Sequence, residues 1–309
     1  MNKKKHPMLN RMWRDKQLYL FLLVPVIYII IFRYVPMGGA VIAFKDYKAR
    51  DGILGSDWIG FKNFIKFFNS YDFYRNIRNT LILSAYTIIA GFPLPICFAL
   101  IINSIRNEKF KKVTQTIVTL PHFISTTVMV GILMNIFANR TGLYGAIGYA
   151  LTGEYPPDLF ASPSVFRHMY VWSGVWQSFG WGSIIYTAAL SAVDPQYHEA
   201  AQIDGATRFQ RIIHVDLPTI LPTIIIMLIL RVGDIMSVGF EKAYLMQNTL
   251  NYDASTIIST YVYSVGLASS GRSDLSYATA IDLFNSVINL IMIIVVNKIA
   301  GKVSETSLW

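Results

Sequence analysis

Long apolar stretches alternate with shorter polar ones along the whole chain. Three of them contain no Asp, Glu, Lys or Arg over more than 20 residues: Asn79–Ile102, Val113–Asn139 and His168–Val193. At about 1.5 Å per residue, each is long enough to cross a hydrocarbon core of ~30 Å. Three others qualify with a flaw, because one is short and two carry charged residues: Leu18–Phe32, Leu217–Val238 and Leu275–Asn297.

This pattern predicts an all-α integral membrane protein with six transmembrane helices. They are expected at about residues 18–34, 79–102, 114–138, 168–191, 217–238 and 275–297. Pro93, Pro95 and Pro121 fall inside the second and third of these helices. Proline removes a backbone donor and kinks a membrane helix, which suits a bundle that leaves room inside. Phe61–Tyr74 is expected to form an amphipathic helix at the membrane surface that leads into the second span.

Composition supports a membrane protein and charge indicates its orientation. Of 309 residues, 53% are hydrophobic and 15% are charged, against about 25% charged in globular proteins. With a cytoplasmic N-terminus, the inner segments hold 14 Lys and Arg in 69 positions, and the outer segments hold 10 in about 112. The positive-inside rule predicts this asymmetry. The net charge of +9 is therefore attributed to topology, with both termini cytoplasmic and no nucleic-acid partner.

The N-terminal segment admits a second interpretation. A basic region before an apolar stretch also describes a secretory signal peptide, with Gly38-Gly39-Ala40 as its cleavage region. Cleavage would leave five spans, and the loops would then no longer alternate consistently with charge. We therefore expect residues 1–17 as a cytoplasmic segment, 18–300 as the six-span domain and 301–309 as a cytoplasmic tail. The single cysteine, Cys97, offers no disulfide framework and no thiolate metal site.

A polar segment at residues 194–218 separates the fourth and fifth predicted spans on the cytoplasmic side. Asp194-Pro195 is a helix start, with Asp at the N-cap and Pro at the first helical position. Gly205 is a helix stop. Ala200 and Ala201 leave part of this helix nearly bare of side chains, which permits close approach by another protein. Glu199 beside them offers a carboxylate to a cation in that partner.

A second short helix is expected over Thr207–Asp216, presenting Phe209, Ile212 and Ile213 on one face. The residues alone leave open that the whole segment is an ordinary cytoplasmic loop with two helical turns. Alanine pairs are common in helices and do not by themselves indicate docking.

The spacing within this segment resembles the EAA loop of ABC importer permeases. Glu199-Ala200-Ala201 is followed after three residues by Gly205, after nine more by Val215, and after one more by Leu217-Pro218. The family pattern has Ile where this chain has Val215, which is a conservative departure. The resemblance implies a type I ABC importer permease fold with a cytoplasmic coupling helix seated in the ATPase. The docking residues that it implies are Glu199, Ala200, Ala201, Asp204, Gly205 and Phe209.

The resemblance extends over nearly the whole chain, to the LplB/YtepO-like polysaccharide-type branch of carbohydrate permeases of Gram-positive bacteria. The matching segments are Gly239–Lys242, Gln247-Asn248, Asn251-Tyr252, Ser259–Tyr263, Ala280–Ser286 and Glu305–Trp309. Such permeases lie in the bacterial plasma membrane, pair with a second homologous permease and receive oligosaccharide from a lipid-anchored extracellular binding protein. Two copies of a cytoplasmic ATPase drive them and bind the ATP and Mg. This chain has no Walker-type phosphate loop, so it is expected to be a non-catalytic subunit without a cofactor.

Polar residues inside the spans indicate where a carbohydrate would pass, because they are costly in lipid and usually face a cavity or one another. Arg231 and Asp234 stand three apart on the fifth span and can share a face. They are interpreted either as a polar lining for the sugar path or as an internal ion pair that holds two spans together.

Aromatic and amide side chains supply further candidates for the path. Trp172, Trp176 and Gln177 on the fourth span combine rings that stack on sugars with an amide that bonds hydroxyl groups. A tryptophan belt at the membrane surface is the alternative for Trp172. Asn135, Asn285 and Asn289 are weaker candidates, since amides also bridge helices. His122 lacks a second His or a carboxylate nearby in the sequence and is interpreted as structural, and no metal site is expected.

Two other classes of function compete with an importer permease. An ion-coupled secondary transporter could use Arg231 and Asp234 for coupling, but it would tend to show paired broken helices in two inverted halves, which the sequence lacks. A membrane-embedded hydrolase would need a nucleophile and a base, or a metal constellation, inside the spans. His122 and His168 are isolated and supply neither.

Overall fold

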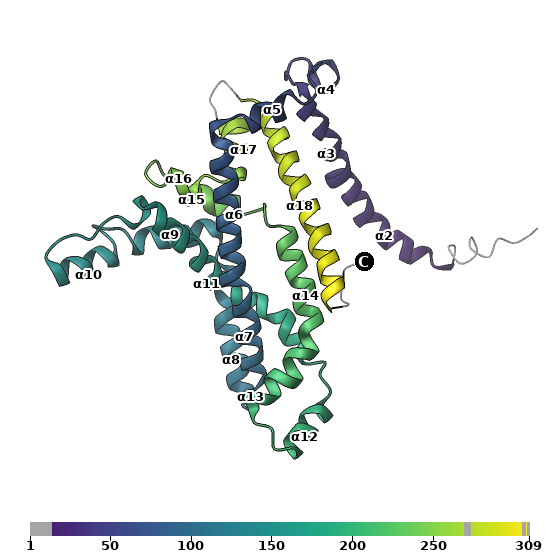
Figure 1. Cartoon of the computed structure of the whole chain (residues 1–309), viewed down its shortest axis with the longest axis vertical. Coiled ribbons are helices and arrows are strands. Elements are labelled where there is room, and N and C mark those ends of the chain that lie inside the picture. Colours follow the sequence, from purple (N-terminus) through teal and green to yellow (C-terminus); the bar gives the residue numbers. More distant parts are fainter. Residues whose placement is uncertain (1–13, 269–272, 305–306, 308–309) are drawn as a thin grey trace, which may run out of the picture. The chain divides into compact units, whose positions relative to one another are not determined.

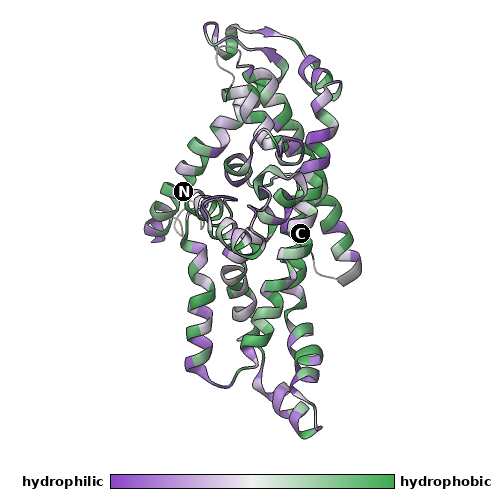
Figure 2. Ribbon diagram, turned by 90° about the vertical axis from the view of Figure 1, so that its left-hand side faces the viewer, coloured by the Kyte–Doolittle hydropathy of each residue, from purple (hydrophilic) through white to green (hydrophobic). Residues whose placement is uncertain are grey.

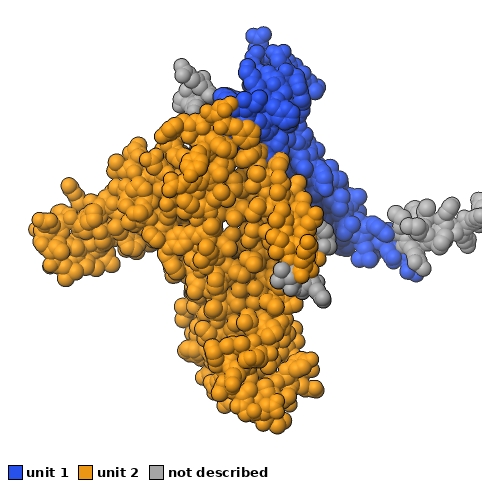
Figure 3. All heavy atoms as spheres, in the orientation of Figure 1, with its two compact units in different colours: residues 1–67, 265–283 blue, residues 68–264, 284–309 orange. Residues whose placement is uncertain are grey.

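Helices dominate the computed structural model, which describes residues 14–268, 273–304 and 307. Two short strands, β1 (Lys45–Asp46) and β2 (Asp57–Trp58), pair antiparallel. The predicted all-α class is confirmed for the described part of the chain (Figure 1). The chain forms two compact units: unit 1 comprises residues 1–67 and 265–283, and unit 2 comprises residues 68–264 and 284–309 (Figure 3).

Unit 1 begins with a single long helix. The α-helix α2 (Lys16–Ile29), the π-helix η1 (Ile30–Tyr34), α3 (Val35–Met37) and the 3-10 helix η2 (Gly38–Phe44) follow one another without a gap. Together they form a helix of 29 residues, so the predicted span at 18–34 is longer than the apolar pattern suggested. Residues 1–13, including most of the predicted basic segment, lie outside the described residues.

The rest of unit 1 is tied together by polar contacts. After α4 (Gly52–Gly55) and β2, the helix α5 (Lys62–Phe68) begins. Lys66 forms an ion pair with Asp274 at 2.8 Å, and the backbone N–H of Tyr47 donates to Ser276 Oγ at 2.8 Å. These contacts attach the N-terminal segment to the chain that leads into the last helix, α18 (Leu275–Ser304).

The second predicted span of the chain, which lies in unit 2, is longer than predicted and consists of two helices in series. These are α6 (Tyr71–Gly91) and α7 (Pro93–Asn103), which meet at Phe92. Pro93 and Pro95 lie in the first turn of α7, where proline is tolerated because the first N–H groups of a helix have no intrahelical acceptor. The two helices together give 33 residues of apolar helix.

The third predicted span is broken. The helix α8 (Glu108–Thr119) passes into the 3-10 helix η3 (Leu120–Phe123), and α9 (Thr126–Ile136) then leaves at an angle of 94°. Pro121 lacks the N–H that would continue α8, and the Ser125 side chain accepts from the Val128 N–H to start α9. The predicted kink at Pro121 is thus a full change of direction.

The helix α11 (Pro163–Leu190) is the centre of unit 2. It packs against α6, α7, α8 and α14 (Leu217–Gly233). One buried apolar cluster includes Leu83, Phe166 and Val171, and a second includes Ile96, Tyr186 and Ile220. Apolar residues line these helices, and polar ones gather at the tip that carries the polar segment 194–218 (Figure 2).

Four helices are long and apolar enough to cross a membrane, and the bent pair α8–α9 raises this number to five among the described residues. The four are Lys16–Phe44, Tyr71–Asn103, Arg208–Gly233 and Leu275–Lys302. With 28 residues, α11 is long enough but is not one of the four. The count of six therefore stays a prediction.

Short helices fill the two connections on the predicted outer side of unit 2. The first holds α10 (Leu143–Thr152) and the 3-10 helix η4 (Leu159–Ala161), and the second holds α15 (Phe240–Met246), α16 (Tyr252–Ser255) and α17 (Ile258–Tyr263), followed by the π-helix η6 (Ser264–Ala268). Asn251 and Asn248 each donate a side-chain hydrogen bond to the Phe160 carbonyl, at 3.0 and 2.9 Å. These bonds fasten the second connection to the first.

Candidate coupling helix and membrane cavity

The polar segment 194–218 starts with the helix that its sequence predicts. Asp194 accepts from the Gln196 N–H at 2.9 Å, and Pro195 is the first residue of α12 (Pro195–Ile203). Gly205 follows with φ of +78°, a left-handed conformation that glycine adopts without steric cost. The boundaries of α12 are therefore set by residues within the segment itself.

The second half of the segment differs from the single helix predicted at 207–216. Thr207 and Gln210 form a capping box that starts α13 (Arg208–Arg211), and the π-helix η5 (Ile212–Asp216) then leads directly into α14. The predicted shared face of Phe209, Ile212 and Ile213 is wrong. Ile212 packs on the buried cluster around Ile220, whereas Phe209 and Ile213 are exposed, because the wider π turn changes the side-chain register.

Most of the helix α12 is exposed, and its exposed residues mix small, acidic and apolar side chains, among them Glu199, which also lines a cavity with His198 and Asp216. Glu199 and Ala200 are exposed, as are Asp204 and Gly205, and Ala201 is half-buried. Tyr197 and Ile203 are also exposed, the latter at 86%. Tyr197 and Ile203 were not predicted as docking residues, although large apolar residues in an otherwise polar helix could have indicated them.

The inner face of α12 is anchored by a buried carboxylate. His198 Nε2 lies 3.2 Å from Asp216 Oδ1, and Asp216 is only 3% exposed. Asn103 at the end of α7 donates to the same carboxylate at 3.4 Å. This contact joins α12 to η5 and α7, and it was not predicted from the sequence. Beside it lies a cavity of about 440 Å³ whose wall includes Arg106, Arg208 and Arg211.

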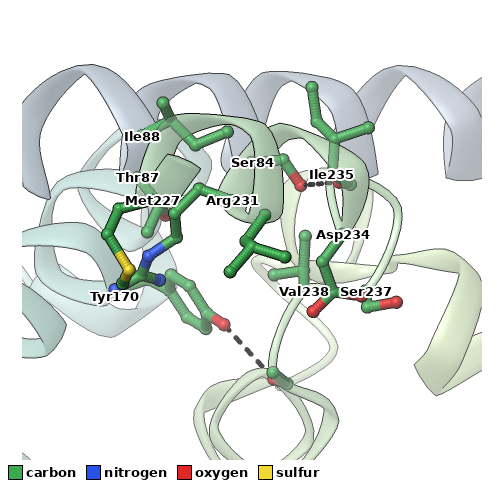
Figure 4. A pocket seen from close by; sticks show the side chains of 12 residues that line it. Ser84, Thr87, Ile88, Tyr170, Met227, Arg231, Asp234, Ile235, Ser237 and Val238 are labelled. Carbon is green, nitrogen blue, oxygen red and sulfur yellow. Dashed lines mark hydrogen bonds between the residues drawn. The ribbon is translucent and has the colours of Figure 1, made fainter. Parts of the chain in front are cut away.

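A second cavity, of about 300 Å³, lies between the helices of unit 2 (Figure 4). It is enclosed by α6, α11, α14 and the chain that follows α14. Its wall consists of Ser84, Thr87, Ile88, Tyr170, Met227, Leu230, Arg231, Asp234, Ile235, Ser237, Val238 and Gly239. Arg231 and Asp234, both selected from the sequence, are thus lining residues of one cavity.

Arg231 and Asp234 do not neutralise each other. Figure 4 shows the Arg231 guanidinium beside the Tyr170 ring, while the Asp234 carboxylate is directed toward Ser237. The ion pairs found among the described residues do not include one between them. The structure therefore does not support the alternative of an internal pair.

An adjoining cavity of about 140 Å³ shares Thr87, Tyr170 and Arg231 with the first and adds Gln177 and Lys242. The Lys242 ammonium donates to the Tyr170 carbonyl and lies 4.6 Å from the centre of the Tyr170 ring. Gly174 makes room for it, since a Cβ there would lie 3.0 Å from Lys242 Nζ. Burial lowers the pKa of Lys242 to about 7. Lys242 was part of the family resemblance but was not predicted as a residue of the path.

Trp172 and Trp176 lie at a different place from Arg231. They line a fourth cavity, of about 390 Å³, with His168 and Leu133. Trp172 Nε1 donates to the Tyr86 hydroxyl at 2.9 Å, and that hydroxyl lies 2.7 Å from His168 Nδ1. Gln177 instead donates to the Ile124 carbonyl at 2.7 Å. The expected set of two tryptophans and an amide is therefore divided between two cavities.

The asparagine candidates have separate surroundings. Asn135 donates to the Gly131 carbonyl of its own helix at 2.8 Å. Asn285 is buried, and its Oδ1 has no hydrogen-bond partner among the described residues. Asn289 accepts from the Met236 N–H at 2.9 Å and donates to Ser237 Oγ at 2.8 Å, which is the helix-bridging role considered as the alternative. None of the three lines the cavity that contains Arg231.

His122 is held by ring stacking. Its ring lies 4.5 Å from that of Trp181 at an interplanar angle of 7°. No group of three or more His, Cys, Asp or Glu side chains suited to a metal ion occurs among the described residues. The structural interpretation of His122 is consistent with this packing.

Comparisons with known proteins cover almost the entire chain. The family model "Binding-protein-dependent transport system inner membrane component" matches residues 91–305. Protein LplB of Bacillus subtilis (strain 168) is 43% identical over 96% of this chain and 92% of its own length. The polygalacturonan/rhamnogalacturonan transport system permease protein YteP of the same organism is 39% identical over 99% of this chain and 94% of its own.

Solved structures agree with these sequence matches. One chain of a bacterial ABC transporter involved in import of the acidic polysaccharide alginate is 37% identical, with a TM-score of 0.85. That match covers 96% of this chain and 99% of the other. The expected permease fold and the expected family are both confirmed. The chain belongs to the inner-membrane components of binding-protein-dependent transport systems.

Proposed function

We propose that this chain is the transmembrane permease subunit of an ATP-driven ABC importer that moves an oligosaccharide into the cytoplasm by alternating access. The observation that carries the proposal is the similarity over the full length to permeases named for polygalacturonan/rhamnogalacturonan transport and to the alginate importer. A polar cavity between the spanning helices and an exposed helix outside them supply the two parts that such a subunit needs.

The exposed helix α12 is proposed as the contact with the ATPase. Glu199, Ala200, Ala201, Asp204, Gly205 and Phe209 form the docking surface in this proposal, and Tyr197 and Ile203 extend it. Phe209 is 70% exposed and Ile203 is 86% exposed. Large apolar side chains left in water favour a protein partner. The anchor between His198 and Asp216 supports transmission, since it connects α12 to the start of α14.

The proposed assembly contains further subunits. A second, homologous permease would complete the path through the membrane, and two ATPase copies would bind ATP and Mg on the cytoplasmic side. A lipid-anchored extracellular binding protein would deliver the sugar; one related structure contains an alginate pentasaccharide-bound periplasmic protein. Placing α12 in the cytoplasm requires cytoplasmic N- and C-termini and a multi-pass chain in the bacterial plasma membrane.

The docking claim is tested with Glu199→Lys in the complete transporter. The exposed carboxylate on α12 becomes a cation, so we expect the variant to insert into the membrane normally but to lose the ATPase during purification. Glu154→Lys, a matched exposed change between α10 and η4, should retain it. Equal recovery of ATPase with both variants would reject α12 as the docking helix.

The energy source separates this proposal from its alternative. Proteoliposomes that contain the complete transporter should take up sugar when ATP is inside and the binding protein is outside, with ionophores present. Uptake that ionophores abolish, and that an inactive ATPase leaves unchanged, would favour an ion-coupled secondary transporter.

A further inference from the structure

We propose that the cavity around Arg231 and Tyr170 recognises a carboxylate-bearing sugar, and that Arg231 binds its carboxylate. The inference rests on the proposed function and adds the chemical class of the substrate, a uronic-acid oligosaccharide. It assigns selection of acidic over neutral sugars to Arg231, whose role the sequence left open.

The charge of Arg231 has no ion-pair partner among the residues that the structure describes. The side chain belongs to α14, inside a segment apolar enough to span a membrane, where an uncompensated guanidinium is costly. Among the described residues, no hydrogen bond or ion pair is recorded for this guanidinium, and Asp234 is directed away from it (Figure 4). A guanidinium offers five donors in a planar fork that fits a carboxylate through two parallel hydrogen bonds.

Lys242 adds a second basic group to the same space, and it is protonated in about half of the molecules near pH 7 because burial lowers its pKa to about 7. It shares the smaller cavity with Arg231, and within the described part of the chain its ammonium donates to the Tyr170 carbonyl. An ammonium group has three donors, so this bond leaves donors for a ligand. Together, Arg231 and Lys242 outweigh the single carboxylate of Asp234, which favours an anionic occupant.

The hydroxyl groups of the wall select the rest of the ligand. The Ser84 hydroxyl donates to the Ile235 carbonyl, the Thr87 hydroxyl to the Leu83 carbonyl at 2.8 Å, and the Tyr170 hydroxyl to the Gly239 carbonyl at 3.2 Å. A hydroxyl that has used its hydrogen can only accept further hydrogen bonds. These three oxygens, with the Asp234 carboxylate, therefore face the cavity as acceptors.

The basic side chains and the acceptor oxygens of the wall together fit one kind of ligand. The cations need an anionic acceptor, and the wall oxygens need donors such as sugar hydroxyls. The buried Tyr170 ring forms part of the same wall, with the Lys242 ammonium 4.6 Å from its centre. A volume of about 300 Å³ is at the small end of ligand sites. A polyhydroxylated acid satisfies all of these groups, whereas a neutral sugar would offer acceptors to the Arg231 guanidinium but no negative charge to balance it.

The test compares acidic and neutral sugars of equal size in the complete transporter. Proteoliposomes with the partner permease, the ATPase and saturating binding protein are supplied with trigalacturonate or trimannuronate, and with their carboxyl-reduced neutral counterparts. Wild type should import an acidic member faster. Arg231→Gln should slow acidic uptake about 10- to 100-fold, as expected for loss of hydrogen bonds between charged groups, and change neutral uptake less than about twofold.

Two further variants complete the test. Arg231→Lys keeps the charge but loses the planar fork, so acidic uptake should fall to an intermediate level. Arg140→Gln removes a cation outside the cavity and should change neither uptake. The binding protein is identical in every sample, so differences between variants arise in the permease.

Each alternative outcome has a distinct meaning. Equal losses for acidic and neutral sugars in Arg231→Gln would assign Arg231 to a contact with the partner permease and overturn the inference. Faster import of the neutral sugars by wild type would also overturn it, while the proposed function would stand. Failure to import any of the sugars with an active ATPase would reject the proposed function itself.

Discussion

The coupling segment 194–218 is built from residues that are close in sequence. The cavity around Tyr170 is built from residues that are far apart in sequence. Every cap of α12 and α13 comes from a residue within the segment, from Asp194 to Gln210. The cavity instead combines α6, α11, α14 and the residues after α14. A local motif is visible in the sequence, whereas a cavity depends on packing between distant helices. We therefore expect mutations in the segment to affect ATPase association, and mutations in the cavity to affect the choice of sugar.

The largest expected effect concerns the end of α12. Gly205 has a φ of +78°, and a left-handed conformation costs other residues roughly 1–2 kcal/mol, more for a β-branched side chain. Gly205→Val should therefore displace the proposed docking surface and weaken ATPase association about tenfold or more, as measured by co-purification. Gly153→Val is the matched control, because Gly153 has a φ of +77° at the end of α10.

Both variants carry the same backbone strain, so a general loss of stability would affect them equally. ATPase recovery that falls to the same extent in both would show that Gly205 has no special role. Loss of the ATPase from Gly205→Val but not from Gly153→Val would show that the coupling segment carries the docking function.

Breaking the contact between His198 and Asp216 should lower transport less than Gly205→Val does. Asp216→Asn keeps an acceptor for His198 but removes the charge, so ATPase-driven uptake should fall about fivefold while membrane insertion is unchanged. A double-mutant cycle with His198→Gln isolates the contact, because effects of residues in contact are not additive. Additive losses in the two single variants and the double variant would show that the pair does not couple α12 to α14.

The sequence predicted the coupling segment well because helix caps and stops are local chemistry. Asp194, Pro195 and Gly205 predict the boundaries of α12 without knowledge of any neighbour. The prediction failed at Ile212, where the chain enters a π-helix and turns that side chain into the core. A wider turn depends on packing against the buried cluster around Ile220, which the local pattern does not contain.

The cavity could be predicted only in part. Arg231 and Asp234 stood out because charges are rare inside membrane spans, but whether they pair depends on side-chain directions that spacing leaves open. Lys242 lies eleven residues after Arg231 in a predicted outer connection, so nothing local placed it beside Gly174. Trp172 and Trp176 are spaced like a sugar platform, yet the packing of α9 against α11 gives them a cavity of their own.

Lys242 offers a way to sharpen the role of the cavity. Lys242→Met removes the charge at similar length, and the ratio of acidic to neutral uptake should fall about threefold. The effect should be smaller than that of Arg231→Gln because the ammonium already has the Tyr170 carbonyl as an acceptor. The ratio is the correct measurement, since loss of folded transporter lowers both uptakes equally. An unchanged ratio would restrict Lys242 to fixing the position of Tyr170.

The smallest effect is expected for the tryptophans, and it tests whether the two cavities share one function. Trp176→Phe keeps an apolar ring in the cavity with His168 and Leu133, and the Arg231 cavity has no contribution from that side chain. Uptake of acidic and neutral sugars should therefore each change less than about twofold, in the assay used for Arg231→Gln. A loss of acidic uptake as large as that of Arg231→Gln would mean that the sugar contacts both cavities. The path would then include the face of α11 that carries Trp172 and Trp176.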